Sequence, residues 1–478
     1  QGLEVDSLFD LTYPELAFDI TNEETKAPSG NFGLPNNVSI RFHHGMVAPT
    51  NEAFEQFINT FLVGPNRWGS IEGAPRHIRR IIANTHMSVN PIYPTDFQTG
   101  FYNGERDVVS VNTASVVSKK YGSNCTFIGV DEAIVPRAFS SVTGPIYLQR
   151  GYSRSMYAIE TSGLLSALKR RNEDYTLFVE SDMNLGLDSS LLYDPIEEEF
   201  SLFQGIGMEA RQLPVSVNDL RTLLLNHIGT KSPTGQAKKE FVKNLAGNYI
   251  VFDNETGIVS GTGRTTVGYR GNIYAPNYPT QISNSADNGI TYDIENWFEF
   301  SSGNIYNIIK GSYPHFHSLL RKAGYDRSNE FRYSIISDNE FYTVFIPTAE
   351  AINEAGADTL SGKKLQDFVL MHLVQGEMIF TDGKQSQGYY ETVRPSEEST
   401  EFTTVYTKIF LKPGIDVIEI AGNSGNNYIT LNQSGKTNII TARTIASEED
   451  GQPTYPNIVS QAVIHEIGKA FSLDKMDT

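Results

Sequence analysis

Three short sequence blocks recur along the chain in a fixed order, and this repetition limits the possible folds more than any other feature. In the C-terminal copy the blocks read FYTVFIPTAEAI (341–352), LQDFVLMHLVQGEM (365–378) and IVSQAVIHEIGKAF (458–471). Each middle block carries a histidine: His86, His227 and His372, which lie 141 (227 − 86) and 145 (372 − 227) residues apart. Because repetition at a fixed period indicates repeated structural units, three such units account for the 478 residues.

The two earlier copies are less regular than the last one. The middle copy is degenerate, and the segments between its blocks differ in length from those of the other copies. The blocks of the first copy are GMVAPTNEAFEQFI (45–58), IRRIIANTHMS (78–88) and SNCTFIGVDEAIV (123–135), and those of the second are YTLFVESDMNLGL (175–187), LRTLLLNHIGT (220–230) and DNGITYDIENWF (287–298).

The first block predicts a strand that turns directly into a helix. Apolar and polar residues alternate up to Pro347, which has no backbone N–H and therefore stops sheet pairing. Thr348 follows as a helix N-cap, since its hydroxyl can accept a hydrogen bond from an N–H of the first turn. Pro49 and Thr50 repeat this pair in the first copy. Helix, strand, turn and helix in each unit, followed by strand-rich sequence, predict α+β domains.

The ordered trio of blocks resembles the fasciclin (FAS1) domain family. The resemblance is strongest in the third copy and covers nearly the whole chain. It implies three tandem FAS1-like domains, each a wedge or sandwich of mixed β-sheet with a cluster of small helices. The expected domains are 1–150, with an atypical or trimmed N-terminal part, 151–311, with an insertion at 231–285, and 312–478, with an insertion at 380–456.

The family resemblance also implies that His86, His227 and His372 are structural, with rings that hydrogen-bond to nearby backbone. The same position recurs without an acid or nucleophile that recurs beside it, which disfavours a catalytic role. The sequence has no HExxH motif and no Cys/His cluster, so we expect no metal, no cofactor and no catalytic residues. With 56 Asp and Glu residues, no carboxylate pair stands out as a glycosidase site.

Composition excludes some functional classes. The formal net charge of −18 argues against binding to nucleic acid or adsorption to anionic lipid. No apolar stretch is long enough to span a bilayer. The single cysteine, Cys125, allows no intrachain disulfide, and we expect a small buried side chain there.

We therefore expect a non-enzymatic extracellular adhesion or ligand-binding protein, displayed on a bacterial surface or anchored in the outer membrane, or held in the periplasm. The resemblance implies export, with a signal and a lipidated cysteine upstream of residue 1. One alternative is a glycan-capturing surface lipoprotein of a nutrient-uptake system. A weaker one is an exported hydrolase with its site in the inserted loops.

The insertions are where we expect ligand contacts, with a surface protein or a glycan as partner. They combine Gly and Asn with tyrosines that can stack on and hydrogen-bond to such a ligand. The alternative is ordinary hairpins with half-buried tyrosines. The tyrosines of the second insertion are Tyr389, Tyr390, Tyr406, Tyr428 and Tyr455.

Overall fold

The computed structural model describes most of the chain and divides it into two compact units. Unit 1 comprises residues 1–173, 181–183 and 272–291, and unit 2 comprises 174–180, 184–271 and 292–478. The structure describes residues 44–122, 125–183, 190–204, 211–263, 267–268, 271–272, 286–445 and 457–478. Outside these ranges lie the expected N-terminal part of the first domain (1–40), parts of both insertions, and Tyr455.

Unit 1 combines short strands with short helices. Its strands are β1 (His44–Pro49), β2 (Met87–Ser88), β3 (Phe101–Tyr102), β4 (Val108–Val109), β5 (Val116–Tyr121) and β6 (Cys125–Val130). Its helices are α3 (Asn51–Phe61), α4 (Arg76–Thr85), α5 (Asp96–Thr99), α6 (Arg137–Ser140), α7 (Gly144–Leu148), α8 (Ser153–Thr161) and α9 (Leu165–Leu168). Cys125, the first residue of β6, is partly exposed, so the expectation of a buried side chain there is wrong.

Unit 2 is richer in strands. Its helices are α10 (Val217–Asn226), α11 (Ile305–Ser312), α12 (Pro314–Lys322), α13 (Ala349–Glu354) and α14 (Gly362–Met371). Its strands before α11 include β7 (Tyr175–Glu180), β8 (Leu191–Asp194), β9 (Glu199–Gln204), β10 (Arg211–Val215), β11 (Ile228–Gly229), β12 (Lys239–Lys243), β13 (Tyr249–Asp253), β14 (Ile258–Ser260) and β15 (Val267–Gly268). Two further strands, β16 (Gly271–Asn272) and β17 (Gly289–Ile294), run across the unit boundaries along the chain.

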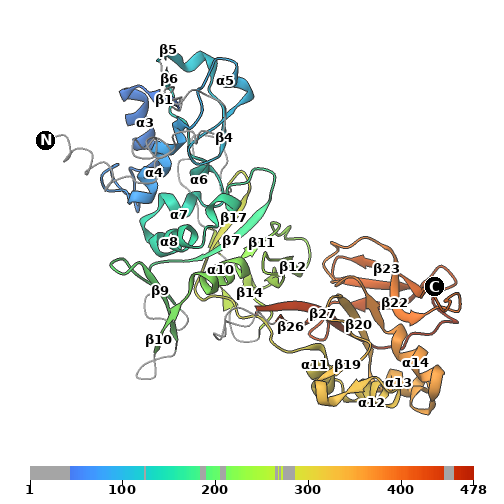
Figure 1. Cartoon of the computed structure of the whole chain (residues 1–478). Coiled ribbons are helices and arrows are strands. Elements are labelled where there is room, and N and C mark those ends of the chain that lie inside the picture. Colours follow the sequence, from blue (N-terminus) through green and yellow to red (C-terminus); the bar gives the residue numbers. More distant parts are fainter. Residues whose placement is uncertain are drawn as a thin grey trace, which may run out of the picture. The chain divides into compact units, whose positions relative to one another are not determined.

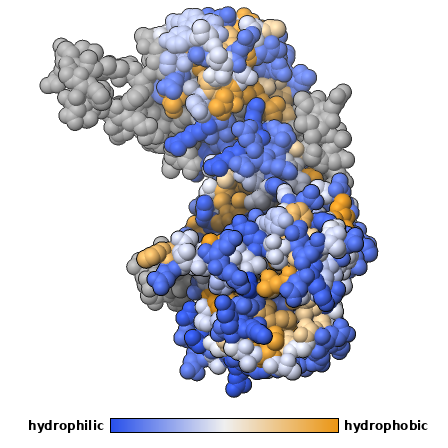
Figure 2. Space-filling model, turned by 90° about the vertical axis from the view of Figure 1, so that its right-hand side faces the viewer, coloured by the Kyte–Doolittle hydropathy of each residue, from blue (hydrophilic) through white to orange (hydrophobic). Residues whose placement is uncertain are grey.

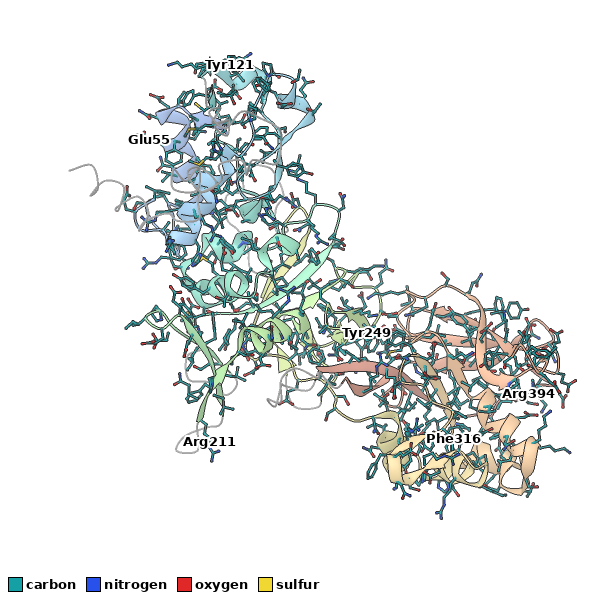
Figure 3. The ribbon with its side chains drawn as sticks, in the orientation of Figure 1. Glu55, Tyr121, Arg211, Tyr249, Phe316 and Arg394 are labelled. Carbon is teal, nitrogen blue, oxygen red and sulfur yellow. The ribbon has the colours of Figure 1, made fainter. Side chains whose placement is uncertain are left out.

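The C-terminal part of unit 2 is built on one eight-stranded sheet of order β25-β24-β23-β22-β21-β20-β27-β26. Helices α11 to α14 gather on one side of it (Figure 1). Phe316 of α12 lies in the core between these helices and the sheet, and Figure 3 shows its position relative to Arg394 of β22. The strands are β18 (Asp326–Arg327), β19 (Arg332–Tyr333), β20 (Tyr342–Pro347), β21 (Leu373–Gln375), β22 (Gly388–Pro395), β23 (Tyr406–Gly414), β24 (Val417–Ala421), β25 (Asn427–Asn432), β26 (Ile439–Ile445) and β27 (Asn457–Ile467).

The same strand neighbours recur around each copy of the first block. The three sheets contain the runs β2-β1-β6, β11-β7-β17 and β21-β20-β27. In the first and last runs the central strand is parallel to the strand of the third block and antiparallel to the short strand after the histidine. Helices and mixed sheets in this arrangement confirm the α+β class.

The two predicted insertions form sheets and pack on each other inside unit 2. Strands β12 to β15 make a four-stranded antiparallel sheet, and β22 to β26 extend the C-terminal sheet. Phe241 of β12 stacks on Phe380 with 4.5 Å between ring centroids, and Tyr249 of β13 lies 4.7 Å from the same ring. The N–H of Phe241 donates to Asp382 at 3.0 Å. Much of the inserted sequence therefore serves the core rather than exposed loops.

The surface is largely hydrophilic. On the face shown in Figure 2, hydrophilic side chains predominate, with smaller hydrophobic areas among them. Among the described residues, none of the helices has the length and apolar character needed to cross a bilayer.

Candidate functional site

The ring of His372 joins three parts of the C-terminal domain. Its Nδ1 lies 2.7 Å from the carbonyl oxygen of Phe368, one turn earlier in α14, and its Nε2 accepts a hydrogen bond from the N–H of Phe471 at 2.9 Å. Its own carbonyl accepts from the N–H of Phe345 in β20 at 2.9 Å. Because the Phe471 N–H can only donate, the ring must be neutral, with its proton on Nδ1.

His86 and His227 make the same three contacts in their own segments. In each case the ring bridges the end of its helix to the C-terminal end of the third block, and the histidine carbonyl pairs with the first-block strand. The partners are Ile82 O, Ile134 N and Val47 N for His86, and Leu223 O, Phe298 N and Phe178 N for His227.

All three rings are buried, which decides their protonation. His227 and His372 are 0 % exposed, and burial lowers the pKa of each to about 4 although the carbonyl hydrogen bond opposes the shift. Burial also lowers the pKa of His86. Rings that are neutral and fully hydrogen-bonded to backbone have little capacity for acid–base chemistry at neutral pH.

The proline–threonine pairs lie at the turn from strand to helix. The Thr50 hydroxyl accepts from Ala53 N at 3.2 Å, and the Thr348 hydroxyl accepts from Ala351 N at 3.2 Å. Pro49 and Pro347 are the last residues of β1 and β20. The threonine hydroxyls serve the backbone, and Pro49 lines the same groove of about 480 Å³ as His86. That Pro49, Thr50, Pro347, Thr348 and the three histidines act as a structural motif stays a prediction.

Sequence reasoning missed a fourth buried histidine, His465 in β27. Its Nδ1 accepts from Asn438 N at 3.2 Å, and its Nε2 donates to Ile379 O at 2.8 Å, so its tautomer is opposite to that of His372. Burial lowers its pKa to about 4. Its position on the inward face of a strand within an apolar run was the signal that could have identified it.

A buried charged cluster in unit 1 also escaped sequence analysis, because its members are scattered along the chain. Arg80 of α4 lies 2.9 Å from Glu160 of α8 and 3.7 Å from Glu105. Lys169 lies 2.9 Å from Asp107 and 3.7 Å from Glu105. Cations and carboxylates are closely paired here, as expected of a structural ion network. Within the described residues, no group of His, Cys, Asp or Glu side chains could hold a metal ion.

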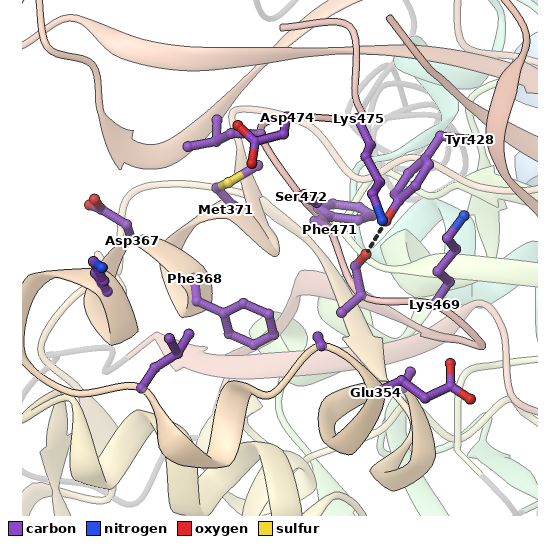
Figure 4. Close-up of a pocket in the computed structure, with 16 residues that line it drawn as sticks. Glu354, Asp367, Phe368, Met371, Tyr428, Lys469, Phe471, Ser472, Asp474 and Lys475 are labelled. Carbon is purple, nitrogen blue, oxygen red and sulfur yellow. Dashed lines mark hydrogen bonds between the residues drawn. The ribbon is translucent and has the colours of Figure 1, made fainter.

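A groove of about 690 Å³ in the C-terminal domain has the features of a binding site (Figure 4). Helices α13 and α14 form one wall, and the chain after β27 forms the other. Phe368, Met371 and Phe471 form its apolar floor beside the His372 ring, and Phe368 is the most exposed of the three, since Met371 and Phe471 are each 3 % exposed. The complete lining is Ala351, Glu354, Ala355, Leu360, Lys364, Asp367, Phe368, Met371, Tyr428, Lys469, Ala470, Phe471, Ser472, Leu473, Asp474 and Lys475.

The rim of the groove is charged and partly preorganised. Asp367 faces the buried Arg394 at 3.4 Å, which neutralises much of its charge. Among the described residues, no carboxylate lies within 4 Å of the amino groups of Lys364, Lys469 or Lys475. The rim therefore carries three ammonium groups together with the carboxylates of Glu354 and Asp474, an arrangement that suits a ligand with apolar and polar or charged parts.

Tyr428 is the contribution of the second insertion to this groove. Its hydroxyl donates to the carbonyl of Ala470 at 2.9 Å, and the Lys469 ammonium lies 3.9 Å from its ring centroid. These contacts fix both side chains at the groove edge. About half of the remaining lining residues lie in the repeated blocks and the others lie just beside them, so the expectation that ligands contact the insertions alone stays a prediction.

The lining of the groove contains no histidine or cysteine. Its ionisable side chains besides Tyr428 are Glu354, Lys364, Asp367, Lys469, Asp474 and Lys475.

Comparison with known proteins identifies the C-terminal region. The model of the Fasciclin domain family matches residues 311–448. A FAS1 domain pair from the insect cell adhesion molecule fasciclin I is a structural neighbour, with 12% sequence identity and a TM-score of 0.22. That match covers 67% of this chain and 96% of the neighbour. A search of curated proteins returned no match.

Fasciclin domains are generally non-enzymatic and adhesion-related, and they are typically extracellular. The match in residues 311–448 includes α13 and α14, which line the groove, and His372, which supports its floor. Residues 311–448 of this chain are therefore similar to the Fasciclin domain family.

Proposed function

We propose that this protein is a non-enzymatic adhesion or ligand-binding protein, and that the groove between α13, α14 and residues 469–475 binds its ligand. The observation that carries this proposal is the groove itself: an apolar floor of Phe368, Met371 and Phe471 surrounded by lysines and carboxylates of the rim. Adhesion is the activity typical of the family, and no feature of the groove calls for a reaction.

The groove suits a ligand with an apolar group flanked by polar or charged ones. Buried aromatic anchors commonly dominate binding energy, while charges at a rim mainly steer association and select partners. Display of many copies on a surface would raise the overall avidity above that of a single groove. Export and display on a bacterial cell surface belong to this proposal.

Three tandem fasciclin-like domains, 1–150, 151–311 and 312–478, are also part of the proposal. Support comes from the recurrence of the histidine contacts and of the strand neighbours in all three segments. Only the last segment contains a matched family model.

The test is an array of matrix proteins and glycans probed with the purified full chain, followed by Lys469→Glu. This exposed residue lies at the groove edge, so its reversal should weaken binding without unfolding the protein. Lys310→Glu is the matched control, since Lys310 also lies over a tyrosine ring in unit 2, 5.3 Å from Tyr306, but does not line the groove. If the wild type and both variants bound the ligand equally well, the groove would not be the binding site. A glycan hit would favour the capture of carbohydrate, and a protein hit would favour adhesion.

A further inference from the structure

The groove beside His372, here called the first groove, has a counterpart beside His227, here called the second groove. Both lie within unit 2. Four lining residues of each groove stand eight, five, four and one positions before the buried histidine. They pair as Lys364 with Asp219, Asp367 with Thr222, Phe368 with Leu223, and Met371 with Asn226.

The opposite wall of the second groove corresponds as well. The N–H of Phe298 donates to Nε2 of His227 at 2.7 Å. Phe471 and His372 make the same contact at 2.9 Å beside the first groove. In both pairs the phenylalanine ring stacks on the histidine, with centroids 4.8 and 4.6 Å apart. The fold therefore places a second groove, of about 290 Å³, at the same position beside its own histidine.

Strands outside α10 complete the apolar wall of the second groove. Leu202 of β9, Val215 of β10 and Ile458 of β27 line it together with residues of the helix. These three side chains are partly exposed, and so are Leu223 and Phe300. The apolar surface of the groove is therefore accessible to a ligand.

Two asparagine side chains hold one end of the second groove in shape. The Nδ2 of Asn248 donates to Asn226 Oδ1 and to Ile458 O, both at 2.8 Å. The Nδ2 of Asn226 donates to Thr222 O at 3.1 Å, and Asn248 Oδ1 accepts from the Ser460 hydroxyl at 3.2 Å. Because these amides bond to the protein itself, they make the groove preformed and leave its charge to select the ligand.

The charge of the second groove comes from Asp219. Of the described residues that line the groove, it alone has an ionisable side chain. Its Oδ2 accepts from the Ser216 hydroxyl at 2.7 Å, and within the described ranges no Lys, Arg or His nitrogen forms an ion pair with it. At the corresponding position the first groove has Lys364, so the sign of the charge is reversed. A carboxylate at the edge of an apolar site favours a cationic ligand.

We propose that the second groove binds a small molecule in which an apolar group carries an ammonium group. The apolar group would lie against Leu223 and Phe300, and the ammonium group would pair with Asp219. The volume agrees with this class of ligand, because pockets for small molecules begin at about 300 Å³. This site is separate from the one in the proposed function, and each can fail without the other.

Three probes that share a phenyl ring and differ in charge test the proposal: phenethylamine, phenylethanol and phenylpropionate. Their binding to the full chain is titrated by ligand-observed NMR up to about 10 mM, because probes of this size bind weakly. The wild-type chain should bind phenethylamine about five-fold more tightly than phenylethanol. Phenylpropionate should bind most weakly, since its carboxylate is repelled by Asp219.

Substitutions locate the binding site. Asp219→Asn should bring the affinities for phenethylamine and phenylethanol within about two-fold of each other. Glu350→Gln is the matched control, because Glu350 is also an acid in the first turn of a helix of unit 2 but lines neither groove. Leu223→Trp should fill the second groove and weaken both probes at least about ten-fold. Ala355→Trp, in the first groove, should leave them unchanged, which separates the two sites.

Circular dichroism verifies that each variant is folded, and Thr222→Trp replaces Leu223→Trp if the latter unfolds. The proposal is overturned if the wild-type chain binds none of the probes, or binds phenethylamine and phenylethanol equally well. It is also overturned if Asp219→Asn keeps the preference for the amine, or if the folded tryptophan variant binds the probes as the wild type does.

Discussion

Replacing His372 with alanine should destabilise unit 2 by about 3 kcal/mol. The substitution leaves the Phe471 N–H without an acceptor and the Phe368 carbonyl without its ring donor in a site that is 0 % exposed. An unpaired buried group costs about 1–3 kcal/mol. Loss of the ring stacked 4.6 Å from Phe471 adds about 1 kcal/mol, and local relaxation recovers part of the total.

The assay is urea unfolding of the full chain followed by circular dichroism. With a denaturant slope of about 3 kcal/mol per molar, as large units show, the midpoint of the unit 2 transition should fall by about 1 M. His372→Gln retains an acceptor for the Phe471 N–H but loses the donor to Phe368 O. Its unfolding midpoint should therefore fall by about half as much as that of His372→Ala.

The control is His315→Ala, at an exposed position of α12, which should change stability by less than about 0.5 kcal/mol. If His372→Ala were no more destabilising than His315→Ala, the ring would not be a structural bridge. Bound metal at His372 in the purified protein would refute the reasoning directly.

Three further outcomes are expected. His227, His372 and His465 each have a pKa of about 4 in the folded state, whereas the ordinary pKa of a histidine is 6.5. Below pH 6.5 the unfolded chain therefore binds more protons than the folded one. The free energy of unfolding should therefore be highest above pH 6.5 and should fall as the pH drops toward 4, by about 3 kcal/mol for each ring. A urea midpoint that does not change over this pH range would contradict the assignment. Phe380→Ala should cost about 3–5 kcal/mol because its buried ring joins the two insertions, whereas Phe402→Ala, at an exposed position, should be nearly neutral in the same melts. Arg80→Met should cost about 3–5 kcal/mol in unit 1 by removing the arginine from Glu160 and leaving Glu105 with Lys169 alone, and the reasoning fails if thermal unfolding of this variant matches wild type.

Local structure at the repeated blocks could be predicted from sequence because short-range chemistry determines it. A proline ends β20 and a threonine caps α13, and both effects involve residues within one turn. The backbone contacts of His372 were expected from the family resemblance. The geometry adds that the ring reaches Phe471, 99 residues later in the chain.

The groove could not be predicted, because its residues share no sequence pattern. Phe368 lies in a helix, Tyr428 in an inserted strand and Lys469 after the last strand, and only the fold brings them together. The role of the insertions was missed for the same reason. The contact between Phe241 and Phe380 joins segments that look like independent loop-rich sequence.

The most direct test of the proposed function is to fill the groove without changing its charge. Ala355 is an exposed groove residue at the end of α13, so Ala355→Trp should place an indole over the apolar floor. Ala114→Trp, at an exposed position in unit 1, adds the same surface elsewhere. For a ligand identified on the array, we expect the dissociation constant to rise at least about ten-fold, or about 1.4 kcal/mol, in Ala355→Trp and to stay unchanged in Ala114→Trp. Unchanged binding by a folded Ala355→Trp protein would contradict the assignment of the groove as the binding site.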